Sequence, residues 1–216
     1  LCASTQLSRR LFRSGIHHIT YVGKKHLVIA AFNSIFCYDL ENASCSPSIS
    51  PIQGSRPLAF CNAGNGDLYY GEYRNNSERN PVYIHSSNDL GIHWKPIYEF
   101  SGIRHIHGIY YDLYTGAIWI TTGDTDNESG IWVTYDGFVT VENVAGGDQQ
   151  MRAIQLLFTE KYVYFGSDTP LEKNHIYRIC KKTRKLEKLQ QVESSIFWGC
   201  KVKEFLFFST AVEPSL

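Results

Sequence analysis

Arginine and carboxylate residues return along this sequence at nearly regular intervals, each in the same local context. Three arginines precede apolar runs at equal steps of 48 residues: Arg56, Arg104 and Arg152. Acidic residues end the aromatic runs that follow, at steps of 52, 44 and 45 residues: Glu72, Asp124, Asp168 and Glu213. Arginine presents a rigid fork of donors to a carboxylate or sulfate, and acids hydrogen-bond sugar hydroxyls or transfer protons. A fold that brings these residues together would bind an acidic ligand.

Two histidines lie beside the second arginine. His105 and His107 occupy alternate positions of a strand-like run, so their side chains should point to the same side of the strand. Together with Asp124 they could bind a divalent metal, because two imidazoles and a carboxylate suit several transition metals. Histidine pairs of this kind are more often structural. We therefore expect that no cofactor is required, and a metal at His105 and His107 is the alternative.

The elements that would position these residues are β-hairpins. Each hairpin has an apolar strand, a polar turn and a second, aromatic strand that ends in a small residue and a carboxylate. Four segments follow this pattern, at residues 57–73, 105–124, 153–168 and 196–213, and a weaker copy spans 17–33. Each hairpin is followed by an outer pair of strands. The sequence therefore predicts a repeat of four antiparallel strands.

A repeat of about 45 residues with four strands is typical of a β-propeller blade, whereas solenoid repeats are usually shorter. We expect an all-β chain that forms a single domain over residues 1–216. Its blades should fall at 14–50, 55–99, 103–145, 151–191 and 195–216, the last of them incomplete. About four and a half blades of a larger closed propeller are thus predicted. Because both inner strands of a blade have an end at the ligand-binding face, the arginines and acids should converge at one channel mouth.

One predicted turn carries a known family motif. The segment from Ser87 to Trp94, Ser-Asn-Asp-Leu-Gly-Ile-His-Trp, fits the Asp-box pattern S-x-D-x-G-x-x-W, and a shorter version runs from Thr134 to Phe138. The chain thereby resembles the sialidase-like propellers of the Asp-box, or BNR-repeat, family. Segments 104–109 and 119–124 resemble a bacterial branch of such propellers that is often labelled glycosyl hydrolase. The resemblance implies that the Asp of the box bonds to nearby backbone N–H groups, with Gly in a conformation that other residues avoid. The box is therefore expected to be structural.

The resemblance favours a carbohydrate-active protein that binds an acidic or polyhydroxylated glycan at the channel mouth. It implies that the three arginines surround a substrate carboxylate. Glycoside hydrolysis needs two acids that flank the bond, and Asp124 and Asp168 form the best pair because the small residues before them leave space for a ligand. The other residues expected to bind the substrate are Arg56, Glu72, Arg104, His105, His107, Arg152 and Glu213.

Other interpretations stay open. The same mouth could hold a ligand or a protein partner without catalysis, or a metal-assisted polysaccharide lyase could use it to acidify the proton beside a uronate carboxylate. The arginines could also pair with carboxylates of their own or neighbouring blades and have only a structural role. Two acids at hydrolytic separation, one with a raised pKa, would favour the enzyme. Acids that are all paired with arginine would disfavour it.

The composition limits the partners. Twenty-one basic residues balance twenty-one acidic ones, so no net field attracts nucleic acid or an anionic membrane. No run of about 18 apolar residues occurs, and nothing is expected to span a membrane. The six cysteines show no metal-like spacing, and we expect mostly buried free thiols. Such thiols slightly favour a cytoplasmic location, but a removed targeting segment before Leu1 would leave the location open.

Overall fold

The computed structural model describes residues 15–31, 34–46 and 59–214. Arg56 falls outside these residues, and Glu213 lies in a described strand although its side chain does not belong to the described part. The chain forms two compact units. The first combines Leu1–Arg74 with Tyr83–Glu99, and the second combines Asn75–Val82 with Phe100–Leu216. Each unit is described separately below.

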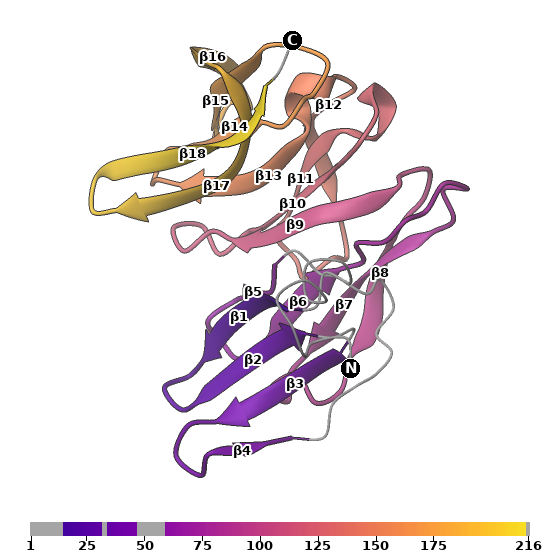
Figure 1. Ribbon diagram of the computed structural model, residues 1–216, viewed down its shortest axis with the longest axis vertical. Coiled ribbons are helices and arrows are strands. Elements are labelled where there is room, and N and C mark those ends of the chain that lie inside the picture. Colours follow the sequence, from indigo (N-terminus) through magenta and orange to yellow (C-terminus); the bar gives the residue numbers. More distant parts are fainter. Residues whose placement is uncertain (1–14, 32–33, 47–58, 215–216) are drawn as a thin grey trace. The chain divides into compact units, whose positions relative to one another are not determined.

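The first unit contains two antiparallel sheets, each with its strands in sequence order (Figure 1). The first sheet consists of β1 (Ile16–Val22), β2 (His26–Ala31), β3 (Ser34–Asp39) and β4 (Ser44–Cys45). The second consists of β5 (Cys61–Asn62), β6 (Leu68–Gly71), β7 (Val82–Ser87) and β8 (Lys95–Phe100). The innermost strands β1 and β5 are in contact. Apolar side chains of both sheets, among them Val28, Ile35, Phe60 and Leu68, form one buried core.

The second unit contains three antiparallel sheets. The first consists of β9 (His105–Tyr111), β10 (Ile118–Gly123), β11 (Gly130–Thr134) and β12 (Glu142–Gly146). The second consists of β13 (Ala153–Phe158), β14 (Tyr162–Ser167), β15 (Asn174–Cys180) and β16 (Leu186–Val192). The third has the two strands β17 (Ser194–Val202) and β18 (Phe205–Pro214). Two short 3₁₀ turns, η1 (Asp126–Glu128) and η2 (Gln149–Met151), connect strands, and neither is long and apolar enough to cross a membrane.

This architecture confirms the all-β prediction. Four sheets of four antiparallel strands and one sheet of two strands are present among the described residues, in line with four and a half blades. In the second unit the innermost strands β9, β13 and β17 contact one another in succession, as neighbouring propeller blades do. Between the sheets lies a buried core that includes Trp119, Ile131, Leu156, Phe165 and Ile179.

The Asp-box segments have the local geometry that the resemblance implies. The Asp89 carboxylate accepts hydrogen bonds from the Ser87 hydroxyl at 2.8 Å and from the His93 backbone N–H at 2.9 Å. Gly91 has φ +78°, and a Cβ there would press against Val28 and Trp94. The box therefore joins its hairpin turn to the core beneath it.

The shorter box repeats the same bonds. The Asp136 carboxylate accepts hydrogen bonds from the Thr134 hydroxyl and the Thr140 backbone N–H, both at 2.9 Å. Gly137 has φ +69°. Because the first and seventh residues of both boxes donate to the Asp at the third position, both turns are structural elements of their sheets.

One expectation about burial was wrong. Of the described cysteines, Cys37 and Cys61 are buried but Cys45 and Cys200 are exposed, so the thiols are not mostly buried. Trp198 is also largely exposed, at 63%. It lies on the two-stranded sheet, where no outer strands are present among the described residues to extend the packing surface.

In the second unit, a buried ion pair connects the β13–β16 sheet to the β9–β12 sheet. The Lys181 ammonium lies 2.6 Å from the Asp112 carboxylate and donates to the Thr159 carbonyl at 2.5 Å, with both charged side chains almost fully buried. Removing one partner of such a pair leaves the other charge buried without compensation.

We therefore expect Lys181→Ala to reduce the free energy of unfolding by about 3–5 kcal/mol. Lys182→Ala is the matched control, because the neighbouring lysine is exposed and its loss should change stability by less than about 0.5 kcal/mol. Urea unfolding followed by tryptophan fluorescence measures both. Equal effects in the two variants would contradict the importance of the pair.

Candidate functional site

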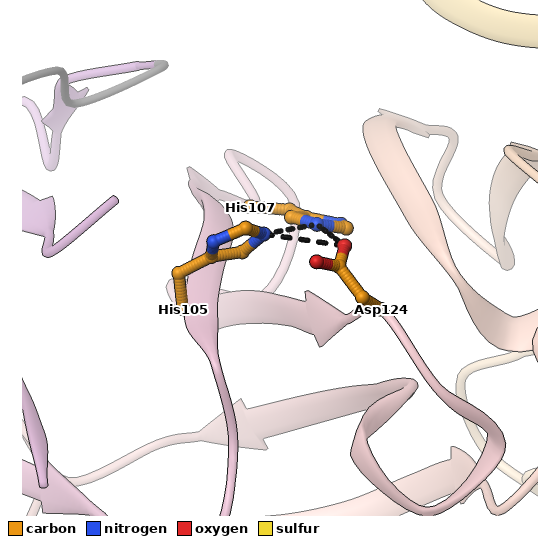
Figure 2. Close-up of side chains that lie close together, drawn as sticks. All are labelled: His105, His107 and Asp124. Atoms are coloured by element: carbon orange, nitrogen blue, oxygen red, sulfur yellow. Dashed lines mark hydrogen bonds and ion pairs between the residues drawn. The ribbon is translucent and has the colours of Figure 1, made fainter. Parts of the chain in front are cut away.

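The side chains of His105, His107 and Asp124 meet at one point inside the second unit. Their rings and carboxylate point toward one another in Figure 2. The two Nε2 atoms are 3.1 Å apart, and Asp124 Oδ1 lies 3.3 Å from His105 Nε2 and 3.4 Å from His107 Nε2. Both histidines are buried, His107 to 2% exposure. The convergence predicted from alternate strand positions is confirmed.

The β9–β10 hairpin creates this convergence. His105 is the Cα partner of Gly123, so Asp124 follows directly beside the start of β9. The register shifts between Thr121 and Thr122, whose partners are Gly108 and Ile106, and His107 is the extra residue at this β-bulge. Bulges redirect side chains and are common beside functional sites. Here the bulge lies at the residue whose ring reaches the Asp124 carboxylate.

Gly123 makes room for the histidine. A Cβ at this position would lie 2.9 Å from His107 Cε1 and 3.1 Å from Arg152 Cγ. We expected the small residues before the acids to leave space for a ligand, and this was wrong at Gly123. The space at Gly123 holds the His107 ring, and the Ser167 hydroxyl bonds to Asn174 Oδ1 and to the His175 backbone N–H, both at 2.9 Å.

Two arginines converge on the same carboxylate. Arg104 Nη1 donates to Asp124 Oδ2 at 2.9 Å, and Arg152 Nη2 lies 3.5 Å from Asp124 Oδ1. Arg152 Nε is also 3.2 Å from Asp168 Oδ2, so this arginine bridges the acids of two sheets. We call these residues the Asp124 cluster: Arg104, His105, His107, Asp124, Arg152 and Asp168. With neutral imidazoles, its two positive and two negative charges balance.

The surroundings set the protonation of the cluster. Burial alone would raise the pKa of Asp124, but its contacts with the imidazoles of His105 and His107 and the charge of Arg152 hold that pKa well below its usual range. Burial lowers the pKa of His107, and the contact with Asp124 only partly opposes this effect. The arrangement therefore favours an ionised Asp124 and a neutral His107 at neutral pH.

Several polar residues that support the cluster were not identified from the sequence. In the loop after Asp124, η1 buries Glu128, which accepts from the Arg104 backbone N–H at 3.1 Å and from Arg79 Nε at 2.7 Å. Asn75 Oδ1 accepts from Arg104 Nη2 at 2.9 Å, and Gln149 Nε2 donates to the Asp124 carbonyl at 2.5 Å. All three lie outside the strands, in the segments before β7, after β10 and before β13, and no local sequence pattern marks them as partners of the cluster.

The other predicted site residues are not among the residues of the Asp124 cluster. Glu72 belongs to the first unit, where its buried carboxylate lies 2.9 Å from His85 Nε2 and 3.5 Å from Arg74 Nε. Arg56 and the Glu213 side chain fall outside the described residues. The structure therefore brings together Arg104, Arg152 and the two aspartates, with the two histidines between them.

Comparison with known proteins identifies the fold. No protein-family model and no curated protein matches this sequence. Similar solved structures include the extracellular domain of a one-component system, BT4673 of B. thetaiotaomicron, with 13% identity and a TM-score of 0.66 over 90% of this chain. The tricorn protease is similar with 13% identity and a TM-score of 0.65 over 92% of this chain. TolB from Acinetobacter baumannii follows with 15% identity and a TM-score of 0.58 over 85% of this chain.

The matched regions make up 25%, 20% and 46% of those three structures. This chain therefore spans at most about half of each. At these identities the likeness concerns the fold alone, and the structures have diverse functions. The chain has the β-propeller fold, made of antiparallel blades.

The tight fit at Gly123 gives a direct test of the site geometry. Gly123→Ala should lower the free energy of unfolding by about 1–3 kcal/mol, because the added methyl group collides with the buried His107 ring. Gly15→Ala is the control, since no heavy atom lies within 4 Å of the Cβ position there. Thermal unfolding compares them. A neutral Gly123→Ala would show that His107 does not occupy this position.

Proposed function

We propose that this chain is a ligand-binding part of a propeller whose Asp124 cluster binds an acidic, hydroxyl-rich ligand of the glycan class. The observation that carries the proposal is the convergence of two arginine side chains on one carboxylate while 37% of Arg104 and 21% of Arg152 stay exposed. A ligand carboxylate can reach such guanidinium groups from solvent. The neighbouring aspartates supply acceptors for sugar hydroxyls.

One donor in the cluster has capacity left. The Nε–H of Arg104 is buried and has no hydrogen-bond partner among the described residues. A buried donor without a partner is costly, so a ligand oxygen that accepts from it would be bound favourably. The Nη1 and Nη2 groups of Arg104 donate to Asp124 and Asn75, and the buried Nε–H is the remaining donor of this guanidinium without a described partner.

Hydrolysis by Asp124 and Asp168 has less support than binding. A glycosidase needs one carboxylic acid with a raised pKa to protonate the leaving group. Asp124 contacts both arginines and both histidines, and its pKa is shifted downward. Asp168 is buried and contacts Arg152. Both acids are paired with arginine, which favours a non-catalytic module over the glycoside hydrolase that the family resemblance suggests.

The relation to sialidase-like propellers remains part of the proposal. The two Asp-box turns support it, because both show the same carboxylate-to-backbone bonds. We further propose that these blades belong to a larger closed propeller. Closure would remove the free edge that the two-stranded sheet presents among the described residues.

Sialyllactose and lactose form a matched pair of probes, because they differ by one acidic sugar. We expect the protein to bind sialyllactose more tightly than lactose, or to show the same preference for a uronate-containing oligosaccharide over its neutral counterpart. Arg104→Ala should weaken acidic-glycan binding by about tenfold to a hundredfold, the effect of losing a charged hydrogen bond. Arg178→Ala should leave binding unchanged, because this arginine pairs with Glu187 elsewhere in the unit. Isothermal titration calorimetry measures each affinity.

Two results would overturn this proposal. One is the absence of any preference for acidic over neutral glycans across a glycan array. The other is equal affinity in the Arg104→Ala and Arg178→Ala variants. Release of free sialic acid or of a shortened oligosaccharide by the wild-type protein would instead support the hydrolase hypothesis.

A further inference from the structure

The three donor atoms of His105, His107 and Asp124 form a triangle with sides of 3.1, 3.3 and 3.4 Å. Zinc-class ions bind imidazole nitrogen and carboxylate oxygen at about 2.0–2.2 Å in tetrahedral sites, which places neighbouring ligand atoms about 3.3–3.6 Å apart. The triangle therefore has nearly the dimensions of one face of such a site. It is the one group of at least three His, Cys, Asp or Glu residues with converging donor atoms in the described part of the chain.

A backbone contact fixes which nitrogen of His107 is available. His107 Nδ1 lies 3.3 Å from the Ala153 carbonyl oxygen. A carbonyl oxygen only accepts hydrogen bonds, so Nδ1 carries the proton and the neutral ring presents the lone pair of Nε2 to His105 and Asp124. Metal-binding histidines commonly have this partner on the other ring nitrogen, where it holds the ring in place.

The resulting arrangement favours a cation between the three groups. The lone pair of His107 Nε2 faces Asp124 Oδ1, which accepts but cannot donate when ionised. If His105 Nε2 carries a proton, it can donate to His107 Nε2 or to Asp124 Oδ1. In either case these two acceptors still face each other. A single metal ion would satisfy all three lone pairs at once.

The charges around the site decide what else the ion would bind. Arg104 and Arg152 oppose a cation, but Arg104 contacts the far oxygen of Asp124, and Arg152 is shared with Asp168. With both imidazoles neutral, as metal binding requires, the cluster carries no net charge, so a divalent ion would give it two positive charges. Three protein ligands also leave a coordination position for a further oxygen, as in open metal sites. An anionic ligand would satisfy both conditions.

We propose that His105, His107 and Asp124 form an open binding site for one divalent transition metal ion of the zinc class. The site stands on its own geometry and does not require glycan binding. If both proposals hold, the ion and the arginines would bind the same acidic group.

The test uses the untagged protein in a Cys45→Ser, Cys200→Ser background, because these exposed thiols could bind metal themselves. After chelator treatment and dialysis, Zn²⁺ is titrated by calorimetry and by thermal unfolding without any glycan. We expect one equivalent to bind per chain. At about a hundred times the dissociation constant, the melting temperature should rise by roughly 5–10 °C. Co²⁺ should give the visible absorption of a nitrogen- and oxygen-bound site without a thiolate charge-transfer band.

Variants then assign the ligands. His107→Gln and His105→Gln should each weaken Zn²⁺ binding by at least the ten- to hundredfold that loss of an outer-shell partner costs. His175→Ala is the matched control, since its ring contacts Gln150 and lies outside the donor triangle. Its affinity for Zn²⁺ should equal that of the Cys45→Ser, Cys200→Ser protein.

Either of two results would overturn the metal site. One is that Zn²⁺ does not bind to the folded background protein, and the other is equal Zn²⁺ affinity in the His107→Gln and His175→Ala variants. The titration of the background protein decides the question even if a histidine variant fails to fold. Because no glycan is present, a negative result leaves the glycan proposal intact, and loss of glycan binding leaves the metal site intact.

Discussion

The Asp124 carboxylate is the interaction on which the site depends. Two guanidinium groups and two imidazole rings lie within 3.5 Å of its oxygens, and they come from two neighbouring sheets. Carboxylates that accept several hydrogen bonds from charged partners stay ionised, and they fix the geometry of those partners. The cluster is therefore arranged around one negative charge. Whatever binds there must replace or share contacts with Asp124.

The blade architecture explains how that carboxylate finds its partners. The first two strands of a blade form a hairpin, so the start of β9 and the end of β10 lie side by side. The neighbouring hairpin of β13 and β14 begins just after Arg152, which carries this arginine to both Asp124 and Asp168. Ion pairs thus connect the two sheets where their innermost strands pack together. The residues proposed to bind a ligand are therefore also residues that connect the two sheets.

The sequence predicted the repeating parts of this account. Period-two alternation placed His105 and His107 on one side of a strand, and the hairpin pattern placed Asp124 beside them. Both inferences rest on local geometry, which a sequence reveals directly. The role of Gly123 could not be predicted in this way, because the His107 ring occupies its free side through a bulge. A bulge changes register without any distinct residue signature.

Polar contacts between residues far apart in the sequence could not be predicted either. Glu128 has the sequence context of a solvated loop residue, and its burial becomes visible only when the 3₁₀ turn places it against the Arg104 backbone. Lys181 likewise lies in a charged stretch but reaches a buried aspartate 69 positions earlier in the sequence. In both cases the partner is supplied by another loop or sheet. Such pairing depends on the packing of blades and has no counterpart in the local pattern.

X-ray absorption at the zinc edge of the Zn²⁺-loaded protein tests the central claim most directly, because it measures the atoms around the ion. We expect nitrogen and oxygen neighbours at about 2.0–2.2 Å, with the outer-shell scattering of two imidazole rings. His105→Gln should remove the contribution of one ring. Sulfur neighbours at about 2.3 Å, or a shell without imidazole scattering, would contradict a metal site formed by His105, His107 and Asp124.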